Sequence, residues 1–255
     1  MRILFIGDII GKPGRRAVRS LVPGLRMELG LNLVVANGEN AAGGFGLTQE
    51  TAEELLDSGV DVITSGGHIW DQKEVIPYLE SDVPVLRPLN YPPGVPGQGY
   101  RQVGDVLVVN LMGRVFMGAL DCPFRAMDAL LKSLSPRPAV IAVDFHAEAT
   151  SEKQGLGWYL DGRVTAVVGS HTHVATADPR ILPKGTAFVT DLGMVGPINS
   201  IIGSNPDDVL ARFLYQTPNR LAVAGGPVRF NSVLVEVDGQ ARRATRIERV
   251  DREVA

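Results

Sequence analysis

Cysteine is nearly absent from this sequence, and long apolar runs are missing altogether. Cys122 is the only cysteine among 255 residues, so no internal disulfide can form, which is typical of proteins in a reducing compartment. No segment approaches the roughly 18 consecutive apolar residues of a membrane helix, and the apolar part of the opening MRILFIGD is too short for a secretory signal. We therefore expect a cytoplasmic protein that does not enter the membrane.

Positive charge is also limited. The 25 lysines and arginines are outnumbered by 28 aspartates and glutamates, the net charge is −3, and no basic run stands out. The sequence thus lacks the basic surface with which proteins bind long nucleic acids. A small anionic substrate, such as a phosphodiester or a nucleotide, is compatible with this charge if metal ions supply positive charge at the site.

The chain is long enough for one sizeable core. With 45% hydrophobic residues, we expect residues 1–255 to form a single domain. Its first half alternates strands, expected at 2–6, 33–36 and 60–63, with helices, expected at 15–29 and 48–56. Continuous apolar strands of this kind are typical of parallel sheets that are covered on both faces.

The sequence of the second half predicts more strands and a C-terminal hairpin. Strands are expected at 105–112, 139–145, 165–168 and 187–190, helices at 123–134 and 207–215, and a hairpin at 228–237 and 241–250. The pattern as a whole indicates an α/β fold. The proline-rich stretch 88–97 and the apolar segment 115–120 are candidates for a subunit contact in a homo-oligomer, but either could equally be a loop packed on its own domain.

All four histidines stand just after predicted strands, and so do two acidic residues. The six positions are Asp8, Glu39, His68, His146, His171 and His173. Ligands bind beyond the carboxyl ends of strands in open α/β sheets, so these positions are expected to converge on one rim. His171 and His173 are two residues apart and would point the same way if their backbone were extended. Although a single histidine is more often structural, six such positions together predict a metal site.

The donor types narrow the choice of metal. Imidazole and carboxylate without thiolate suit iron, manganese or zinc. A carboxylate can bridge two ions roughly 3.5–4 Å apart, an arrangement that holds the attacking and leaving oxygens of a phosphoryl group and acidifies a bound water. Glu39 is the candidate bridge.

Several motifs together point to a family. They are GDIIG at 7–11, NGEN at 37–40, GGH at 66–68, His146 in DFHAEATSEK, and GSHTH at 169–173. In this order they resemble the calcineurin-like metallophosphoesterases, and more closely their YmdB-like branch of 2′,3′-cyclic nucleotide phosphodiesterases. The resemblance covers nearly the whole chain and implies an αββα sandwich of two mixed sheets flanked by helices.

The resemblance also implies a role for each site residue. One metal ion would be held by Asp8, Glu39, Asn40 and His173, and a second by Glu39, His146 and His171. His68 resembles the family's general acid, which protonates the leaving oxygen while a metal-bound hydroxide attacks phosphorus from the opposite side. Asp71 could orient His68 or cap a helix.

Two positions depart from the wider family pattern. Ile10 stands where many metallophosphoesterases have a metal-binding histidine, and Asn40 resembles the substitute ligand in the YmdB-like branch. Gly67 stands where the pattern Gly-Asn-His places a metal-binding asparagine. Because Gly67 has no side chain, we expect water or a backbone carbonyl to fill that position and the second ion to be held more weakly.

Neighbouring side chains offer candidates for substrate contacts. Trp70, Trp158 and Tyr159 could stack on a nucleobase, and Arg87 and Arg163 could hold a phosphate oxygen, although packing and surface salt bridges are the commoner roles for such residues.

Two other functions compete with this interpretation. A dinucleotide-binding turn at GDIIGKPG has the wrong glycine spacing and leaves the histidines without a role. A metal-binding regulatory protein, which binds a nucleotide or protein partner with little turnover, is a stronger alternative, because glycine at position 67 replaces the metal-binding asparagine of the family pattern.

Overall fold

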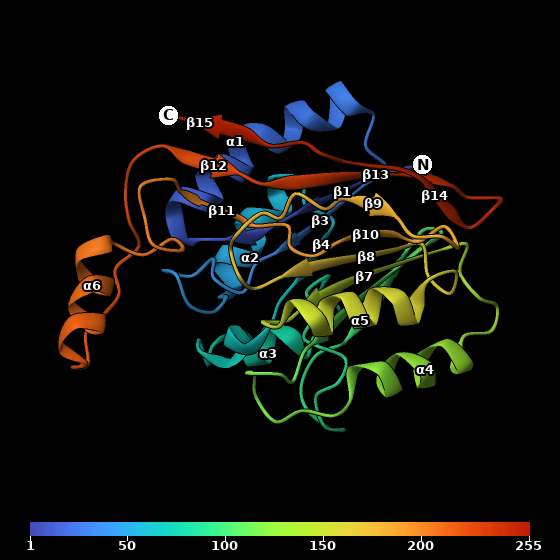
Figure 1. The fold of residues 1–255 in the computed structure, drawn as a ribbon, viewed down its shortest axis with the longest axis horizontal. Helices are drawn as coiled ribbons and strands as arrows, with labels where there is room; N and C mark the ends of the chain where they lie inside the picture. The colour runs from blue at the N-terminus through green and yellow to red at the C-terminus, as the bar shows by residue number, and fades with distance from the viewer.

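Two sheets lie face to face, and helices cover their outer faces. Figure 1 shows this arrangement in the computed structural model, which describes residues 1–255. The first sheet has the order β14-β13-β1-β3-β4, with β14 (Arg243–Arg249), β13 (Ser232–Asp238), β1 (Arg2–Ile6), β3 (Leu33–Asn37) and β4 (Val62–Thr64). Strands β1, β3 and β4 run parallel, while β13 is antiparallel to both of its neighbours.

The second sheet has six strands and is parallel at its centre. Its order is β5 (Tyr100–Val103), β6 (Val106–Met112), β7 (Val140–His146), β8 (Ala166–Ser170), β10 (Ala187–Val189) and β9 (Arg180–Ile181). Both edge strands are antiparallel to their neighbours.

A small third sheet continues the first beyond Gly7 and Asn231. It contains β15 (Arg252–Val254), β12 (Val228–Phe230), β11 (Met194–Pro197) and β2 (Asp8–Ile9). Strand β2 continues the chain after β1, and β12 comes directly before β13. Although β1 and β13 pair directly with each other, β2 and β12 are separated by β11, which pairs with both. This widening at the end of β1 brings Asp8 to the rim of the molecule.

Six helices and one 3-10 turn complete the fold. They are α1 (Gly11–Leu29), α2 (Gln49–Asp57), η1 (Gly67–Trp70), α3 (Val75–Leu79), α4 (Pro123–Ser133), α5 (Thr150–Leu160) and α6 (Pro206–Tyr215). None of the helices combines the length and the apolar character needed to cross a membrane.

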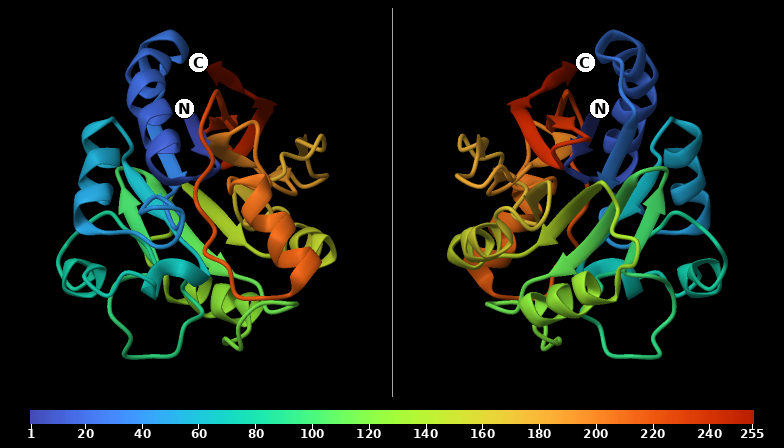
Figure 2. Two further views of the ribbon diagram at one scale, coloured as in Figure 1. Left: turned by 90° about the vertical axis from the view of Figure 1, so that its left-hand side faces the viewer. Right: turned by 90° about the vertical axis from the view of Figure 1, so that its right-hand side faces the viewer.

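The alternation of side chains along β1 shows how the layers form. Ile3 and Phe5 point into the core between the two sheets, whereas Leu4 and Ile6 belong to the core under α1 and α2. A third apolar cluster joins the outer face of the second sheet to α4 and α5. Both faces of the central strands are therefore buried, as their continuous apolar sequences predict. The expected αββα sandwich of two mixed sheets flanked by helices is confirmed, with the small third sheet as an extension of one layer (Figure 2).

Capping residues set the helix starts that the sequence predicts. The hydroxyl of Thr48 accepts a hydrogen bond from the Thr51 backbone N–H, and Asn205 caps α6 in the same way through Asp207. The C-terminal hairpin is confirmed as β13 and β14, except that residues 228–230 of its expected first strand form β12 of the third sheet.

Three helices differ from expectation, and one of them, α3, is a short helix that the sequence does not predict. Helix α1 begins at Gly11, four residues before the expected start at 15, because Pro13 lies in the first turn, where its missing N–H costs no hydrogen bond. Helix α5 has no counterpart among the expected helices, since Gly155 and Gly157 weaken both helix propensity and apolar periodicity. Gly157 is needed there because a Cβ would lie 2.5 Å from the ring of Phe188.

Candidate metal centre

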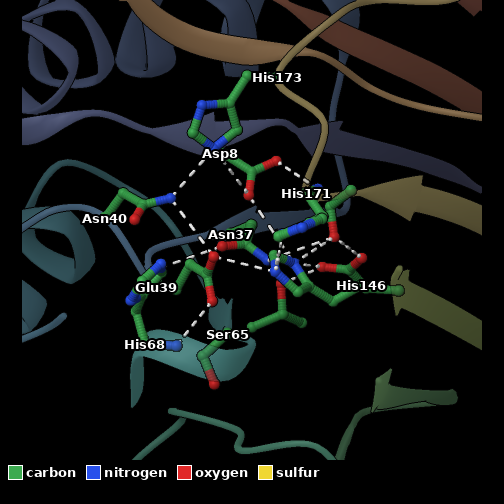
Figure 3. A network of polar contacts seen from close by, with 12 residues as sticks. Asp8, Asn37, Glu39, Asn40, Ser65, His68, His146, His171 and His173 are labelled. Atoms are coloured by element: carbon green, nitrogen blue, oxygen red, sulfur yellow. Dashed lines mark hydrogen bonds and ion pairs between the residues drawn. The ribbon is translucent and has the colours of Figure 1, made fainter. Parts of the chain in front are cut away.

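The metal donors predicted from the sequence meet at the rim where strands of both sheets end (Figure 3). Asp8 lies in β2 directly after β1, Glu39 and Asn40 follow β3, His146 ends β7, and His171 and His173 follow β8. His68 lies in η1, just beyond β4. Each side chain thus owes its position to the end of a buried parallel strand.

The first group of donors comprises Glu39, His146 and His171. Glu39 Oε1 lies 2.9 Å from His146 Nε2, and that nitrogen lies 2.9 Å from His171 Nδ1. One ligand atom from each residue lies within 4.8 Å of the other two, which is close enough for a shared metal ion. These are the residues that the resemblance assigns to the second ion.

The second group lies on the other side of Glu39. Asn40 Nδ2 is 3.2 Å from His173 Nε2 and 3.4 Å from Glu39 Oε1, and Asp8 Oδ1 is 3.8 Å from His173 Nε2. His173 Nδ1 bonds to the backbone oxygen of Ile202 at 2.8 Å, which leaves Nε2 directed at the donor cluster. Glu39 therefore lies between the two groups, as a bridging carboxylate must.

The backbone around His171 and His173 is not extended. Both residues have positive φ angles, 100° and 64°. They do line one cavity, as expected, but the extended backbone that was expected to bring them there is absent. Left-handed conformations are uncommon for residues with a side chain and are kept only where the surroundings enforce them. Here the His171 N–H donates to Asp8 Oδ2 at 3.1 Å, which ties the turn to the cluster.

A buried ion pair holds the same turn from below. Lys153 in α5 lies 2.5 Å from Asp191, which follows β10, and both side chains are about 1% exposed. Asp191 Oδ2 accepts hydrogen bonds from both the backbone N–H and the hydroxyl of Thr172, the residue between the two histidines. The pair thus fixes the backbone from which His171 and His173 project.

Polar residues beneath His146 fix its ring. Ser170 Oγ lies 3.1 Å from His146 Nδ1 and donates to Asp144 at 2.7 Å, and Asn37 Nδ2 lies 3.3 Å from the same ring nitrogen. The Nδ1 side is therefore occupied and Nε2 faces Glu39. Asp144 thus acts on the His146 ring through the hydroxyl of Ser170.

Burial and close charges shift the pKa values of this cluster strongly. Burial raises the pKa of Asp8 to about 6, against the effect of the nearby histidines. Burial also disfavours the charged forms of Glu39 and His146, but their mutual attraction outweighs it, lowering the pKa of Glu39 to about 2 and raising that of His146 to about 9. Burial and the positive charge of His146 lower the pKa of His171 to about 3.

These residues fit a metal ion. Asp8 Oδ1 is fully buried and has no hydrogen-bond partner, which is costly for a carboxylate oxygen. It lies 3.8 Å from ring nitrogens of both His146 and His173, so it faces the cluster. A cation held between these donors would satisfy this oxygen, and oxygen and imidazole ligands suit iron, manganese or zinc.

His68 lies at the open side of the cluster. Its backbone N–H donates to Glu39 Oε2 at 3.3 Å, and its Nδ1 lies 2.8 Å from Asp71 Oδ2. Asp71 is also the residue that ends η1, but its carboxylate contacts the imidazole and so favours the orienting role. Phe45 packs edge-on against the His68 ring, with 5.2 Å between ring centroids.

The other suggested contact residues lie away from the cluster. Trp70 packs against Tyr91, and Arg163 forms an ion pair with Asp128, to which Tyr159 also donates. The residues lining the cavity over the cluster include none of Trp70, Trp158, Tyr159, Arg87 or Arg163. Instead they include Phe45, Arg212 and Phe213, which no sequence motif singles out.

Comparisons with known proteins identify relatives of this chain. A 2′,3′-cyclic-nucleotide 2′-phosphodiesterase of Bacillus subtilis is 48% identical over 98% of this chain and 96% of its own length. A putative phosphatase/phosphodiesterase of Mycoplasma genitalium is 34% identical over 98% of this chain and 92% of its own.

Solved structures match as well. A hypothetical protein of Thermus thermophilus superposes with a TM-score of 0.94 at 48% identity, covering 99% of both chains. A phosphatase of Mycoplasma pneumoniae superposes with a TM-score of 0.93 at 32% identity, covering 99% of this chain and 93% of its own.

The named activities of these relatives are those of phosphodiesterases and phosphatases, which confirms an enzyme rather than a binding protein with little turnover. The profile of the YmdB-like proteins matches residues 4–250. Sequence, fold and relatives agree, and the chain belongs to the YmdB-like family.

Proposed function

We propose that this enzyme hydrolyses small phosphodiesters, and 2′,3′-cyclic nucleotides in particular. The proposal is supported by the name of the Bacillus subtilis relative, with which the chain shares 48% of its residues, and by a donor cluster suited to phosphoryl chemistry. The cavity of about 430 Å³ over the cluster supports a small substrate.

The cluster would hold two metal ions that share Glu39. Asp8, Asn40 and His173 complete the first set of ligands, and His146 and His171 complete the second. Bound there, iron, manganese or zinc would neutralise the phosphate and acidify a water molecule for attack on phosphorus. The chain's own contribution is to fix the donors through Ser170, Asn37 and the Lys153–Asp191 pair.

His68 would protonate the leaving oxygen. The Asp71 carboxylate lies 2.8 Å from Nδ1, so the other ring nitrogen, Nε2, is free to give a proton to the substrate. As the oxygen of a water molecule bonds to phosphorus and that water gives up one proton to solvent, the bond from phosphorus to one ribose oxygen breaks, and that oxygen takes the proton from Nε2. The product is a nucleoside monophosphate in which one of the two esterified ribose oxygens has become a hydroxyl.

One observation carries the proposal: Asp8 Oδ1 is a buried, unpartnered carboxylate oxygen in a cluster of imidazoles. The test is hydrolysis of 2′,3′-cyclic nucleotides, and of a chromogenic phosphodiester, with added manganese. We expect turnover by the wild-type protein and a loss of about 10²- to 10⁴-fold in kcat for His68→Ala. Equal activity in both proteins would remove His68 from the mechanism, and the absence of turnover in the wild type would refute the proposed reaction.

The second ion would be held more weakly than the first because of Gly67. A Cβ at this position would meet nothing closer than Met112 Sδ at 3.8 Å, so a side chain has room to begin there. We expect wild-type protein to lose the second ion on extensive dialysis and Gly67→Asn to retain it, as measured by elemental analysis. Two tightly held ions per wild-type chain would count against this proposal.

A further inference from the structure

The cavity over the donor cluster has two chemically different parts. One part is formed by the metal donors and His68. The other part, which we call the apolar subsite, is formed by Ile10, Phe45, Ile201, Ile202, Val209, Arg212, Phe213, Leu221 and Val223. In a phosphodiesterase the first part accounts for the phosphate, and the second has no role in the reaction described above.

The apolar subsite is joined to the donor cluster by direct contacts. The backbone oxygen of Ile202 bonds to the metal donor His173, and the ring of Phe45 packs on His68. Val223 packs closely on the glycine-rich loop after β3, since a Cβ at Gly44 would lie 2.9 Å from its side chain. A ligand whose phosphate rests on the donors therefore extends directly onto this surface.

Helix α6 forms the outer wall of the apolar subsite. It stands beyond the ends of the strands, at the left of Figure 1, and lies in front of the sheets in the left view of Figure 2. Only Val209 of this helix is buried, and Phe213, at 70% exposure, lines the cavity. A phenyl ring left open to water beside a phosphate site gains stability when a flat apolar group covers it.

The side chains of the apolar subsite suit a planar ring. Two of them are phenyl rings and one is a guanidinium group, and both kinds stack on nucleobases. Arg212 is the only polar side chain among the residues of the apolar subsite, so side-chain hydrogen bonds to the edge of a base are scarce there.

We propose that the apolar subsite, with Phe213 of α6 as a specificity residue, binds the nucleobase of a nucleotide by stacking and burial and does not discriminate strongly between bases. This inference rests on the proposed function, because it takes the phosphate to lie on the donor cluster. An apolar pocket discriminates between similar groups by about 10²-fold at most, whereas a pocket with matched hydrogen bonds reaches about 10⁴-fold or more. The four 2′,3′-cyclic nucleotides are therefore substrates with kcat/KM values within about 100-fold of one another.

The test compares Phe213→Ala with Tyr215→Ala. Tyr215 is an equally exposed aromatic residue of α6, at 72%, but does not line the cavity. Substrates are the four cyclic nucleotides and a base-free analogue, methyl riboside 2′,3′-cyclic phosphate. We expect Phe213→Ala to raise KM for the nucleotides about tenfold and to leave the base-free analogue unchanged, and Tyr215→Ala to match the wild type on every substrate.

Three results would overturn the inference: equal effects of the two substitutions, an equal loss on the base-free analogue, or rejection of one base by about 10⁴-fold. Binding of adenosine to the metal-free protein, followed by NMR titration, separates this inference from the proposed function. If the protein shows no turnover but binds adenosine, and if Phe213→Ala weakens that binding, the proposed reaction is refuted and the proposed base-binding role of the apolar subsite is supported. If the protein hydrolyses cyclic nucleotides but does not bind adenosine, or binds it equally well with Phe213→Ala, the base-binding role of the apolar subsite is refuted and the proposed reaction is supported.

Discussion

Two adjacent glycines allow a sharp test of how tightly the donor cluster is packed. A Cβ on Gly66 would lie 2.1 Å from His146 Cδ2, 2.3 Å from its Nε2 and 2.4 Å from Glu39 Oε2. Ordinary contacts between heavy atoms begin near about 3.5 Å, so Gly66→Ala must displace these donors by roughly 1 Å. A Cβ on Gly67 would instead have its nearest contact at 3.8 Å, with Met112 Sδ. Alanine at the neighbouring position is therefore a matched control.

The two substitutions should have very different effects. A displacement of about 1 Å at reacting groups typically costs about 10²-fold in rate, and overpacking a core costs about 1–3 kcal/mol of stability. We expect Gly66→Ala to lower kcat/KM about 100-fold and to weaken metal binding, with a fall in the melting temperature of roughly 2–12 °C. Gly67→Ala should stay within about threefold of the wild type in kcat/KM. Steady-state kinetics, metal titration and thermal unfolding measure the three quantities, and indistinguishable behaviour of the two variants would refute the described packing.

Three further results are expected from single substitutions and from pH. Asp71→Asn weakens the contact that orients the His68 ring but leaves His68 itself in place. It should therefore lower kcat less than His68→Ala does and leave the metal content unchanged. A change in metal stoichiometry would contradict this orienting role. Lys153→Met leaves the buried carboxylate of Asp191 without its partner and should lower the free energy of unfolding, measured by chemical denaturation, by about 3–5 kcal/mol. Arg229→Met breaks an exposed ion pair with Glu253 and should lower it by about 1 kcal/mol or less. Similar losses for the two variants would show that burial of the Lys153–Asp191 pair does not affect its contribution to stability. Neighbouring carboxylates, outweighing the opposite effect of burial, raise the pKa of His146 to about 9 in the metal-free protein, so this ring carries a proton at pH 7 that a metal must displace. Metal affinity should therefore rise with pH up to about 9, with proton release visible by calorimetry in buffers of different ionisation enthalpy, and a pH-independent affinity would rule out this protonated state.

The sequence predicts the position of the site because strand ends are a local signal. Asp8 and His171 each follow an apolar strand, His146 ends a strand that is apolar apart from Asp144, and parallel pairing then brings such ends to one rim. The helices with strong caps, α2 and α6, are predictable for the same reason, since a cap requires only a few neighbouring residues. That residues 1–255 form a single domain stays a prediction.

What the sequence could not predict depends on contacts between distant segments. Ser170 and Asn37 orient His146 from the ends of β8 and β3, and nothing in their own segments marks them for this task. The left-handed backbone at His171 and His173 is kept by tertiary hydrogen bonds, which no local propensity reveals. Phe213 reaches the cavity only because α6 stands over the strand ends, a placement that helical periodicity does not specify.

The chain brings imidazole and carboxylate donors together, and we propose that these donors hold two cations that share Glu39. Anomalous scattering from crystals of the purified protein, supplied with manganese, tests it most directly. We predict one peak among Asp8, Asn40 and His173 and a second, of lower occupancy, beside His146 and His171, with Glu39 between them. Peaks elsewhere in the molecule, with none among these donors, would contradict the account.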